Sequence, residues 1–216
     1  GFLVLASLTS LTWAFAGMLN PAMSQLHAFV SEYSARDQPW RYLFQTTDVV
    51  MGTSLCLAGL ATLAWARHRP LGRQGWSGIG FVVGGLFSVL DALVTMDCSP
   101  TRSPACMAAE EAGHVSASHI VHVGTSTVVV IGFALPILLL NSTMTRFRGF
   151  GLVVAWAWVI FTLLNGIGAM DWFNGTPMSY TGIWQRLSLG LGTLWWLTLA
   201  ADDVITARAR NHVPSC

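Results

Sequence analysis

The sequence predicts an all-α membrane protein, a polytopic bundle of six transmembrane helices that forms one domain over residues 1–216. Composition supports this fold class, because 53% of the residues are hydrophobic and only 10% are charged, whereas soluble domains carry ~25% charged residues. The apolar residues also fall into six runs, each long enough to cross ~30 Å of hydrocarbon as an α-helix. In hydrocarbon each backbone polar group must be satisfied within its own element, so we expect these runs to be helical.

The six predicted spans alternate with polar connections. They cover residues 1–19, 43–66, 76–96, 116–140, 150–170 and 182–205. The first run has the length of a signal peptide, but no small-residue cleavage motif follows it cleanly, so we expect a true span. The chain begins at Gly1 inside this run without an initiating Met, and we expect the native N-terminus to lie further upstream.

Arginine residues predict how the bundle lies in the membrane. Seven of them flank the spans on one side: Arg67, Arg69, Arg73, Arg146, Arg148, Arg208 and Arg210. Positively charged connections stay in the cytoplasm, which predicts cytoplasmic termini and a location in the bacterial inner (plasma) membrane. The formal net charge is only +1, so nothing points to nucleic acid. Membrane lipids, and other membrane proteins in an assembly, are the expected partners.

The longer loops on the opposite, outer side carry a predicted disulfide and a predicted lid. Cys98 and Cys106 flank a short turn with two prolines, and a disulfide can persist outside a bacterial membrane; the alternative is two free thiols. Glu32 and Tyr33 lie in the first outer loop, and loops often carry function. This segment is either a lid over a cavity or an ordinary surface helix pinned by Trp40.

Two histidines at the start of the fourth span are candidate metal ligands. His119 and His122 are three residues apart, so they share one face of a helix. Two imidazoles at this spacing can bind one zinc ion together with carboxylates from neighbouring helices. The alternative is that one histidine forms a hydrogen bond across helices and the other meets interfacial water.

Four charged residues are predicted to share a layer with these histidines, which makes them candidate catalytic residues. Asp48 and Asp91 lie inside the second and third spans, where a charge costs ~2.5–3.5 kcal/mol and usually faces a partner in the bundle interior. Asp97 ends the third span, and Arg186 opens the sixth. A buried Asp–Arg pair that locks helices together is the structural alternative.

The outer half of the predicted bundle is more polar than the inner half. Further polar residues at the outer level are Asn165, Gln185 and Ser188. The inner half consists mostly of Leu, Val, Ala, Gly and Trp. This asymmetry predicts an outward-facing cavity between the second, third, fourth and sixth spans, in place of a continuous channel.

Several short motifs occur in an order that is also informative. They are Ser31-Glu32-Tyr33-Ser34, Gln38-Pro39-Trp40, Thr95-Met96-Asp97, the stretch Ser118 to His122, Gly182-Ile183-Trp184-Gln185-Arg186, and the pair Trp195 and Trp196. This order resembles a widespread prokaryotic family of six-helix membrane proteins, catalogued as a domain of unknown function (the nine-nine-eight family). The resemblance covers nearly the whole chain. It implies that the family's recurring residues correspond here to Ser31, Glu32, Asp97, His122 (or His119) and Arg186. The family has no settled activity, so the resemblance supports the fold more than a function.

A looser likeness is to the membrane hydrolases that include alkaline ceramidases and adiponectin receptors. Those proteins use a Ser, an Asp and three His to hold zinc inside a helix bundle. The present chain has these residue types, but it has six predicted spans instead of seven. It also lacks a His-x-x-x-His motif in the last span.

Two functions from different classes are consistent with these residues. The first is a metal-dependent hydrolase of a lipid or amide, in which the His pair binds zinc and one of the three aspartates is the third ligand or the general base. Arg186 would then grip a phosphate or carboxylate. The second is a non-enzymatic lipid-binding, transport or accessory subunit of a membrane assembly. Bis-His haem ligation is disfavoured, because only the fourth span carries His within the membrane.

Overall fold

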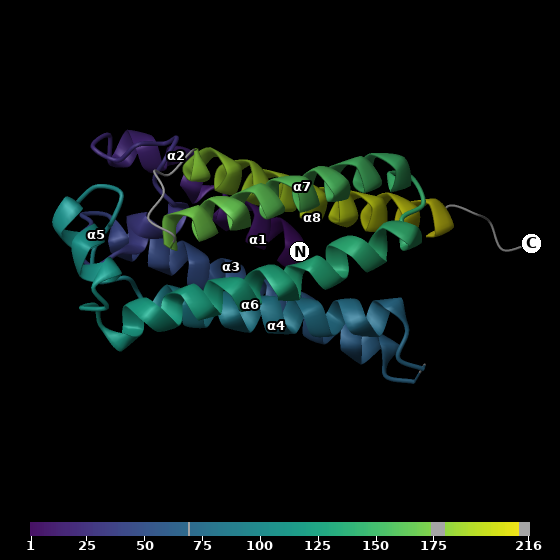
Figure 1. Ribbon diagram of the computed structural model, residues 1–216. Helices are drawn as coiled ribbons and strands as arrows, with labels where there is room; N and C mark the ends of the chain where they lie inside the picture. Colours follow the sequence, from purple (N-terminus) through teal and green to yellow (C-terminus); the bar gives the residue numbers. More distant parts are fainter. Residues whose placement is uncertain (69, 174–179, 212–216) are drawn as a thin grey trace, which may run out of the picture.

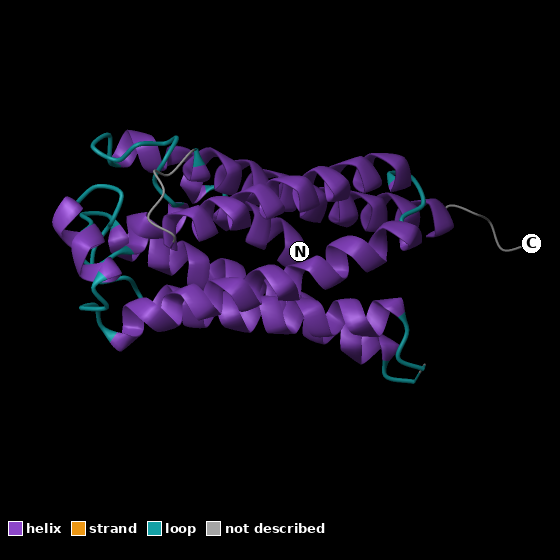
Figure 2. Cartoon of the chain, in the orientation of Figure 1, coloured by secondary structure: helices purple, strands orange, loops and turns teal. Residues whose placement is uncertain are grey.

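The structure is a computed structural model that describes residues 1–68, 70–173 and 180–211, and every regular element in this part is a helix (Figures 1 and 2). The elements are α1 (Phe2–Ser10), α2 (Thr12–Leu19), η1 (Val30–Ser34), α3 (Arg41–Ala66), α4 (Arg73–Leu93), α5 (Pro104–Glu111), α6 (Ala117–Leu139), η2 (Leu140–Thr143), α7 (Arg148–Phe173) and α8 (Thr181–Asn211). The all-α prediction is confirmed for these residues. Arg69 and the side chain of Arg210, which contribute to the predicted orientation, lie outside the described residues.

Five helical segments in the described ranges are long and apolar enough to cross a membrane, which makes the chain a multi-pass membrane protein. They are Phe2–Leu19, Arg41–Ala66, Arg73–Leu93, Ala117–Thr143 and Arg148–Met170. The sixth predicted span forms the 31-residue helix α8. Polar and charged residues within α8 lower its hydropathy, among them Gln185, Arg186, Asp202 and Asp203. That α8 crosses the membrane, and that both termini are cytoplasmic, remain predictions.

The helices form two layers (Figure 1). One layer consists of α3, α4 and α6, which pack side by side, and the other contains α7 packed against α8. α1 lies between the layers, where it contacts both α3 and α8. One end of the bundle carries α5, η1 and the loop with Cys98 and Cys106, and we call it the disulfide end. The α3–α4 and α6–α7 connections lie at the opposite end.

Glycines allow α4 to approach both of its neighbouring helices so closely that their backbones are in contact. A Cβ added at Gly132 of α6 would lie 2.5 Å from the backbone nitrogen of Gly84 in α4. A Cβ added at Gly85 would lie 2.5 Å from the carbonyl oxygen of Gly52 in α3. Small residues at helix contacts are typical of membrane bundles, where packing replaces the hydrophobic effect as the force that joins helices. These contacts make α3, α4 and α6 one tightly packed layer.

Aromatic and amide side chains join the two layers away from the disulfide end. Phe133 of α6 meets Trp196 of α8 edge to face, with ring centroids 5.3 Å apart. Trp195 donates its Nε1–H to Asn141 Oδ1 at 2.9 Å. Both tryptophans are buried. This pair therefore contributes to the packing between the two layers.

The first outer loop is folded onto the bundle. Between Asn20 and Trp40 it contains turns and the short 3-10 helix η1. Glu32 and Tyr33 are 0% and 1% exposed. Such burial does not fit an ordinary surface helix, and the segment instead covers the disulfide end.

Candidate functional site

The predicted disulfide between Cys98 and Cys106 is present. It links the middle of the α4–α5 loop to the first turn of α5. The side chain of Ser103 caps this helix by accepting the N–H of Cys106 at 3.2 Å. The bridge therefore fixes α5 to the α4–α5 loop.

Glu32 joins the two loops of the disulfide end. Its Oε1 accepts the N–H of Phe29 at 2.9 Å. Its Oε2 accepts the N–H of Thr101 at 3.1 Å, the hydroxyl of Thr101 at 2.5 Å and the hydroxyl of Ser99. Burial raises the pKa of Glu32 above its ordinary value of 4.5, although the hydrogen bonds act in the opposite direction. Oε2 of Glu32 thus connects η1 with the disulfide loop, while Oε1 caps the start of η1.

Asp97 fixes the start of α6. Its carboxylate accepts the N–H of Ser116 at 2.6 Å and the hydroxyl of Ser116 at 2.7 Å, and it forms an ion pair with Arg36 at 2.9 Å. Partial burial acts to raise the pKa of Asp97, but the hydrogen bonds from Ser116 and the charge of Arg36 outweigh it and lower the pKa below 3.8. Negative charge also favours the N-terminus of a helix. The structure therefore shows Asp97 in a capping arrangement, while its predicted catalytic role stays a prediction.

His119 lies between Asp97 and Glu110. The backbone N–H of Asp97 donates to His119 Nδ1 at 3.2 Å, so Nδ1 carries the lone pair and Nε2 carries the ring proton. His119 Nε2 lies 3.7 Å from Glu110 Oε1, and the His119 side chain is only 1% exposed. Glu110 is not among the site residues predicted from the sequence, because no motif marks it.

His122 and Asp91 form a second polar contact, between α6 and α4. His122 Nδ1 lies 3.0 Å from the carbonyl oxygen of Val94 and 3.2 Å from Asp91 Oδ1, so Nδ1 carries the proton. His122 Nε2 is buried and has no hydrogen-bond partner among the described residues. Asp91 Oδ1 also accepts the hydroxyls of Thr125 and Ser126 at 2.5 and 2.9 Å. The prediction that Asp91 and His122 share a layer is confirmed.

Asp48 contributes to this layer from α3. It is partly exposed and interacts electrostatically with Asp91. Two acids and one histidine thus gather across α3, α4 and α6, in the layer that the sequence predicted.

Arg186 connects α8 to the first outer loop. Its Nη1 donates to the carbonyl oxygens of Gln25, Ala28 and Gly182, each at 2.9 Å, and Nη2 donates to the Tyr33 hydroxyl at 3.4 Å. The guanidinium is buried and fastens the first outer loop to α8. No carboxylate pairs with it within the ion-pair distance in the described part of the chain, so the Asp–Arg alternative is wrong for this residue.

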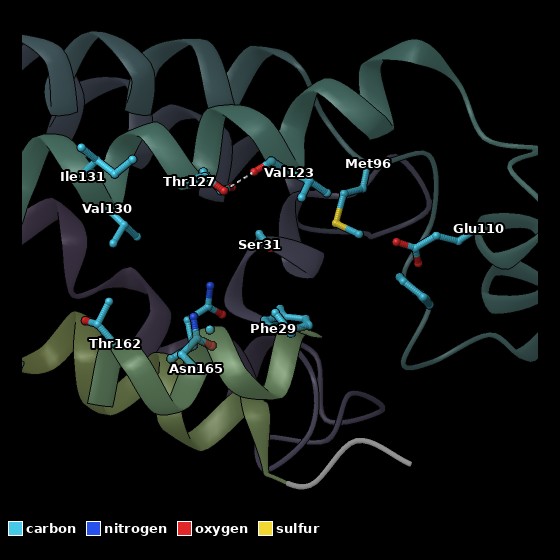
Figure 3. A pocket seen from close by; sticks show the side chains of 15 residues that line it. Phe29, Ser31, Met96, Glu110, Val123, Thr127, Val130, Ile131, Thr162 and Asn165 are labelled. Atoms are coloured by element: carbon cyan, nitrogen blue, oxygen red, sulfur yellow. Dashed lines mark hydrogen bonds between the residues drawn. The ribbon is translucent and has the colours of Figure 1, made fainter. Parts of the chain in front are cut away.

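A pocket of about 290 Å³ lies at the disulfide end between α6 and α7 (Figure 3). The residues that line it are Phe29, Ser31, Met96, Pro100, Glu110, Val123, Ser126, Thr127, Val130, Ile131, Thr162, Asn165, Gly166, Ala169 and Gln185. Figure 3 shows Glu110 at one end, with its carboxylate turned toward the cavity, and Val130 and Ile131 at the other end. The sequence analysis placed the cavity between the second, third, fourth and sixth spans, and this location was wrong. The close packing of α3, α4 and α6 leaves the space on the other face of α6.

The family comparison agrees with the architecture and with the motif order. Residues 3–202 match the family model described as "Protein of unknown function (DUF998)". The chain belongs to this family. No curated protein and no solved structure matches the chain. Membership in the DUF998 family therefore supports the resemblance inferred from the motifs, and it assigns no reaction; the looser likeness to zinc hydrolases has no support from these comparisons.

The predicted site residues of this DUF998 member divide into three groups. Glu32, Tyr33 and Arg186 hold the first outer loop, Asp97 and His119 hold the start of α6, and Asp48, Asp91 and His122 form a layer within the bundle. Ser126, which lines the pocket, connects this layer to it through a hydrogen bond to Asp91. The pocket's own polar residues include Glu110, which no sequence motif marked, and Asn165 and Gln185, which the sequence marked only by their polarity.

Proposed function

We propose that this protein binds a membrane amphiphile in the pocket between α6 and α7. The pocket itself is the observation that carries the proposal. Ligand sites are typically concave and mostly apolar, contain a few convergent polar groups, and have volumes of ~300–1,000 Å³. The pocket of about 290 Å³ lies at the lower end of this range. It therefore suits one part of a lipid, with the rest of the molecule in the bilayer.

The position of the pocket favours a ligand that arrives from the membrane. Ile131 on the α6 side and Gly166 on the α7 side are both exposed at the surface of the bundle. α6 and α7 belong to different layers, and each packs mainly against another partner, α4 or α8. The hydrocarbon chain of a lipid could therefore pass between these two helices from the bilayer into the pocket, without separating the tightly packed helices.

A variant at Gly166 tests this proposal. Gly166 lines the pocket and a Cβ added there meets nothing within 4 Å, so the larger side chain of Gly166→Leu has room to enter the pocket space. Gly124 of α6 is a matched control, because it is exposed, has the same free space and does not line the pocket. Lipid that copurifies with the protein, measured by native mass spectrometry, should be present in the native protein and in Gly124→Leu. It should be lost in Gly166→Leu. Equal lipid occupancy in all three proteins would refute the pocket as the binding site.

A zinc-dependent hydrolase is the second candidate, and His122 is the residue that favours it. Because His122 Nδ1 carries the proton, the buried Nε2 offers a lone pair, as a metal ligand must. His119 does not fit in the same way, since its Nε2 carries the proton and faces Glu110. Within the described ranges no three His, Cys, Asp or Glu side chains form a group suited to a metal ion. The residues therefore do not fit a three-ligand zinc site, and we derive no reaction step through zinc.

Metal analysis decides between the two candidates. The protein should be purified in detergent without a His tag, and its zinc content should be measured by mass spectrometry for the native chain, His119→Ala and His122→Ala. About one zinc per chain that is lost in both variants would favour the hydrolase. A folded native protein without stoichiometric zinc would leave amphiphile binding as the function of the pocket.

A further inference from the structure

Several of the polar groups that face the pocket are hydrogen-bond acceptors. Asn165 Oδ1 is buried and has no hydrogen-bond partner among the described residues. The carboxylate of Glu110 turns toward the same space (Figure 3). A buried acceptor without a donor is costly, and a ligand that brings a donor removes that cost.

The hydroxyls on the α6 wall also present lone pairs to the pocket. Ser126 donates its proton to Asp91 Oδ1 at 2.9 Å, and Thr127 donates its proton to the carbonyl oxygen of Val123 at 3.0 Å, as drawn in Figure 3. A hydroxyl has one proton, so each of these oxygens can only accept from a ligand. Acceptors thus occupy several sides of the cavity.

Gln185 supplies a contrasting group. Its Oε1 accepts the N–H of Val30 at 2.5 Å, which leaves the side-chain NH2 to donate. A ligand carbonyl or ether oxygen is the natural partner for this NH2. The residues that line the pocket in the described part of the chain include no Arg, Lys or His. A phosphate or carboxylate head would therefore find no cationic side chain to pair with among these lining residues.

From these groups we infer that the ligand is a single-chain amphiphile whose head donates hydrogen bonds and carries no negative charge, such as a hydroxyl-bearing monoacylglycerol or a long-chain amine. The head lies toward Glu110 and Asn165, and the hydrocarbon chain runs along Val130 and Ile131 toward the bilayer. This inference rests on the proposed function, because it names the class of amphiphile that the same pocket binds.

Three probes with the same chain length separate the possible head groups: decanoylglycerol, decylamine and decanoate. Binding of each is measured by isothermal titration calorimetry with the full chain in nanodiscs of a zwitterionic phospholipid. We expect decanoylglycerol or decylamine to bind at least ~10-fold more tightly than decanoate, which corresponds to ~1.4 kcal/mol. A preference for the amine would assign an ammonium head, and a preference for the glycerol ester would assign a hydroxyl head.

Two variants test the acceptors directly. Asn165→Leu should weaken the preferred probe about 10-fold, since it removes the unpaired acceptor and keeps a similar volume. Glu110→Gln removes the negative charge of this side chain, so it should reduce the ratio of the affinity for decylamine to the affinity for decanoate. Glu111→Gln is the matched control, because Glu111 is the next residue of α5, is exposed and does not line the pocket.

The outcomes separate this inference from the proposed function. If decanoate binds as tightly as the other probes, and Gly166→Leu abolishes all binding, the pocket binds amphiphiles but the donor-head inference is wrong. If no probe binds, or if Gly166→Leu binds all of them as well as the native protein does, both proposals are wrong.

Discussion

The Glu32 carboxylate accepts a hydrogen bond from the hydroxyl of Ser99, 67 residues further along the chain. This contact joins the first outer loop to the loop that the Cys98–Cys106 disulfide closes. Residues of both loops line the pocket: Phe29 and Ser31 come from the first, and Pro100 from the second. The shape of the pocket therefore depends on a buried carboxylate that does not itself line it.

Replacement of Glu32 should destabilise the protein in a pH-dependent way. In Glu32→Gln an NH2 group replaces an oxygen that accepts hydrogen bonds, which should cost ~1–3 kcal/mol. The pKa of Glu32 is raised above 4.5 in the folded protein, so the folded state binds the proton more tightly than the unfolded state. This contribution to stability is fully present below pH 4.5 and is lost as the pH rises through the folded pKa.

The measurement is the melting temperature in detergent across this pH range. The difference between native protein and Glu32→Gln should be largest at low pH and should shrink as the pH rises. Glu111→Gln, at an exposed position, should follow the native profile. If the difference in melting temperature between the native protein and Glu32→Gln grows as the pH rises, the assigned direction of the Glu32 pKa shift is wrong.

Removal of the disulfide should destabilise the outer loops. The two cysteines are 8 positions apart, and closing a loop of this length contributes ~2–3 kcal/mol in the chain-entropy model. The Cys98→Ser, Cys106→Ser double variant should therefore unfold at lower denaturant concentration, and reductant should shift the native protein in the same direction. Cys56→Ser should keep the native response to reductant, because Cys56 is a free thiol. An identical unfolding midpoint for native and double-variant protein would overturn this prediction.

Gly132→Ala should weaken the packing of α6 against α4. The new Cβ would lie 2.5 and 2.6 Å from backbone atoms of Gly84, so the helices must separate; overpacking of this kind typically costs ~1–3 kcal/mol. Gly124→Ala, in the same helix with free space around it, should have little effect or stabilise slightly. Thermal unfolding of both variants in one detergent checks the prediction, and equal melting temperatures would argue against close contact of the two helices.

The sequence predicted the helices and the disulfide well, because both depend on local signals. Runs of about 20 apolar residues mark helices whatever their partners, and Cys98 and Cys106 are neighbours across a short turn. The shared layer of Asp91 and His122 could also be predicted, since the depth of a residue along a span follows from its residue number.

The pocket could not be predicted, because its position depends on which helices touch. Gly84 and Gly132 bring α4 and α6 to backbone contact, which removes the space that the sequence analysis expected between them. Arg186 was misjudged for a related reason: its partners are carbonyl oxygens of the first outer loop, and backbone groups leave no mark in a sequence. Glu110 became a pocket residue only through tertiary structure, which brings its carboxylate to 3.7 Å from His119 Nε2.

Photo-crosslinking tests the central claim, that an amphiphile binds between α6 and α7, most directly. A decanoylglycerol analogue with a diazirine on its hydrocarbon chain should be irradiated with the native protein in nanodiscs, and the labelled residues should be mapped by peptide mass spectrometry. The account predicts labels on Val130, Ile131 and Ala169, which excess unlabelled decanoylglycerol removes and which are absent in Gly166→Leu. Labels spread over the lipid-facing side chains of all helices, unchanged by competitor and by Gly166→Leu, would contradict the account.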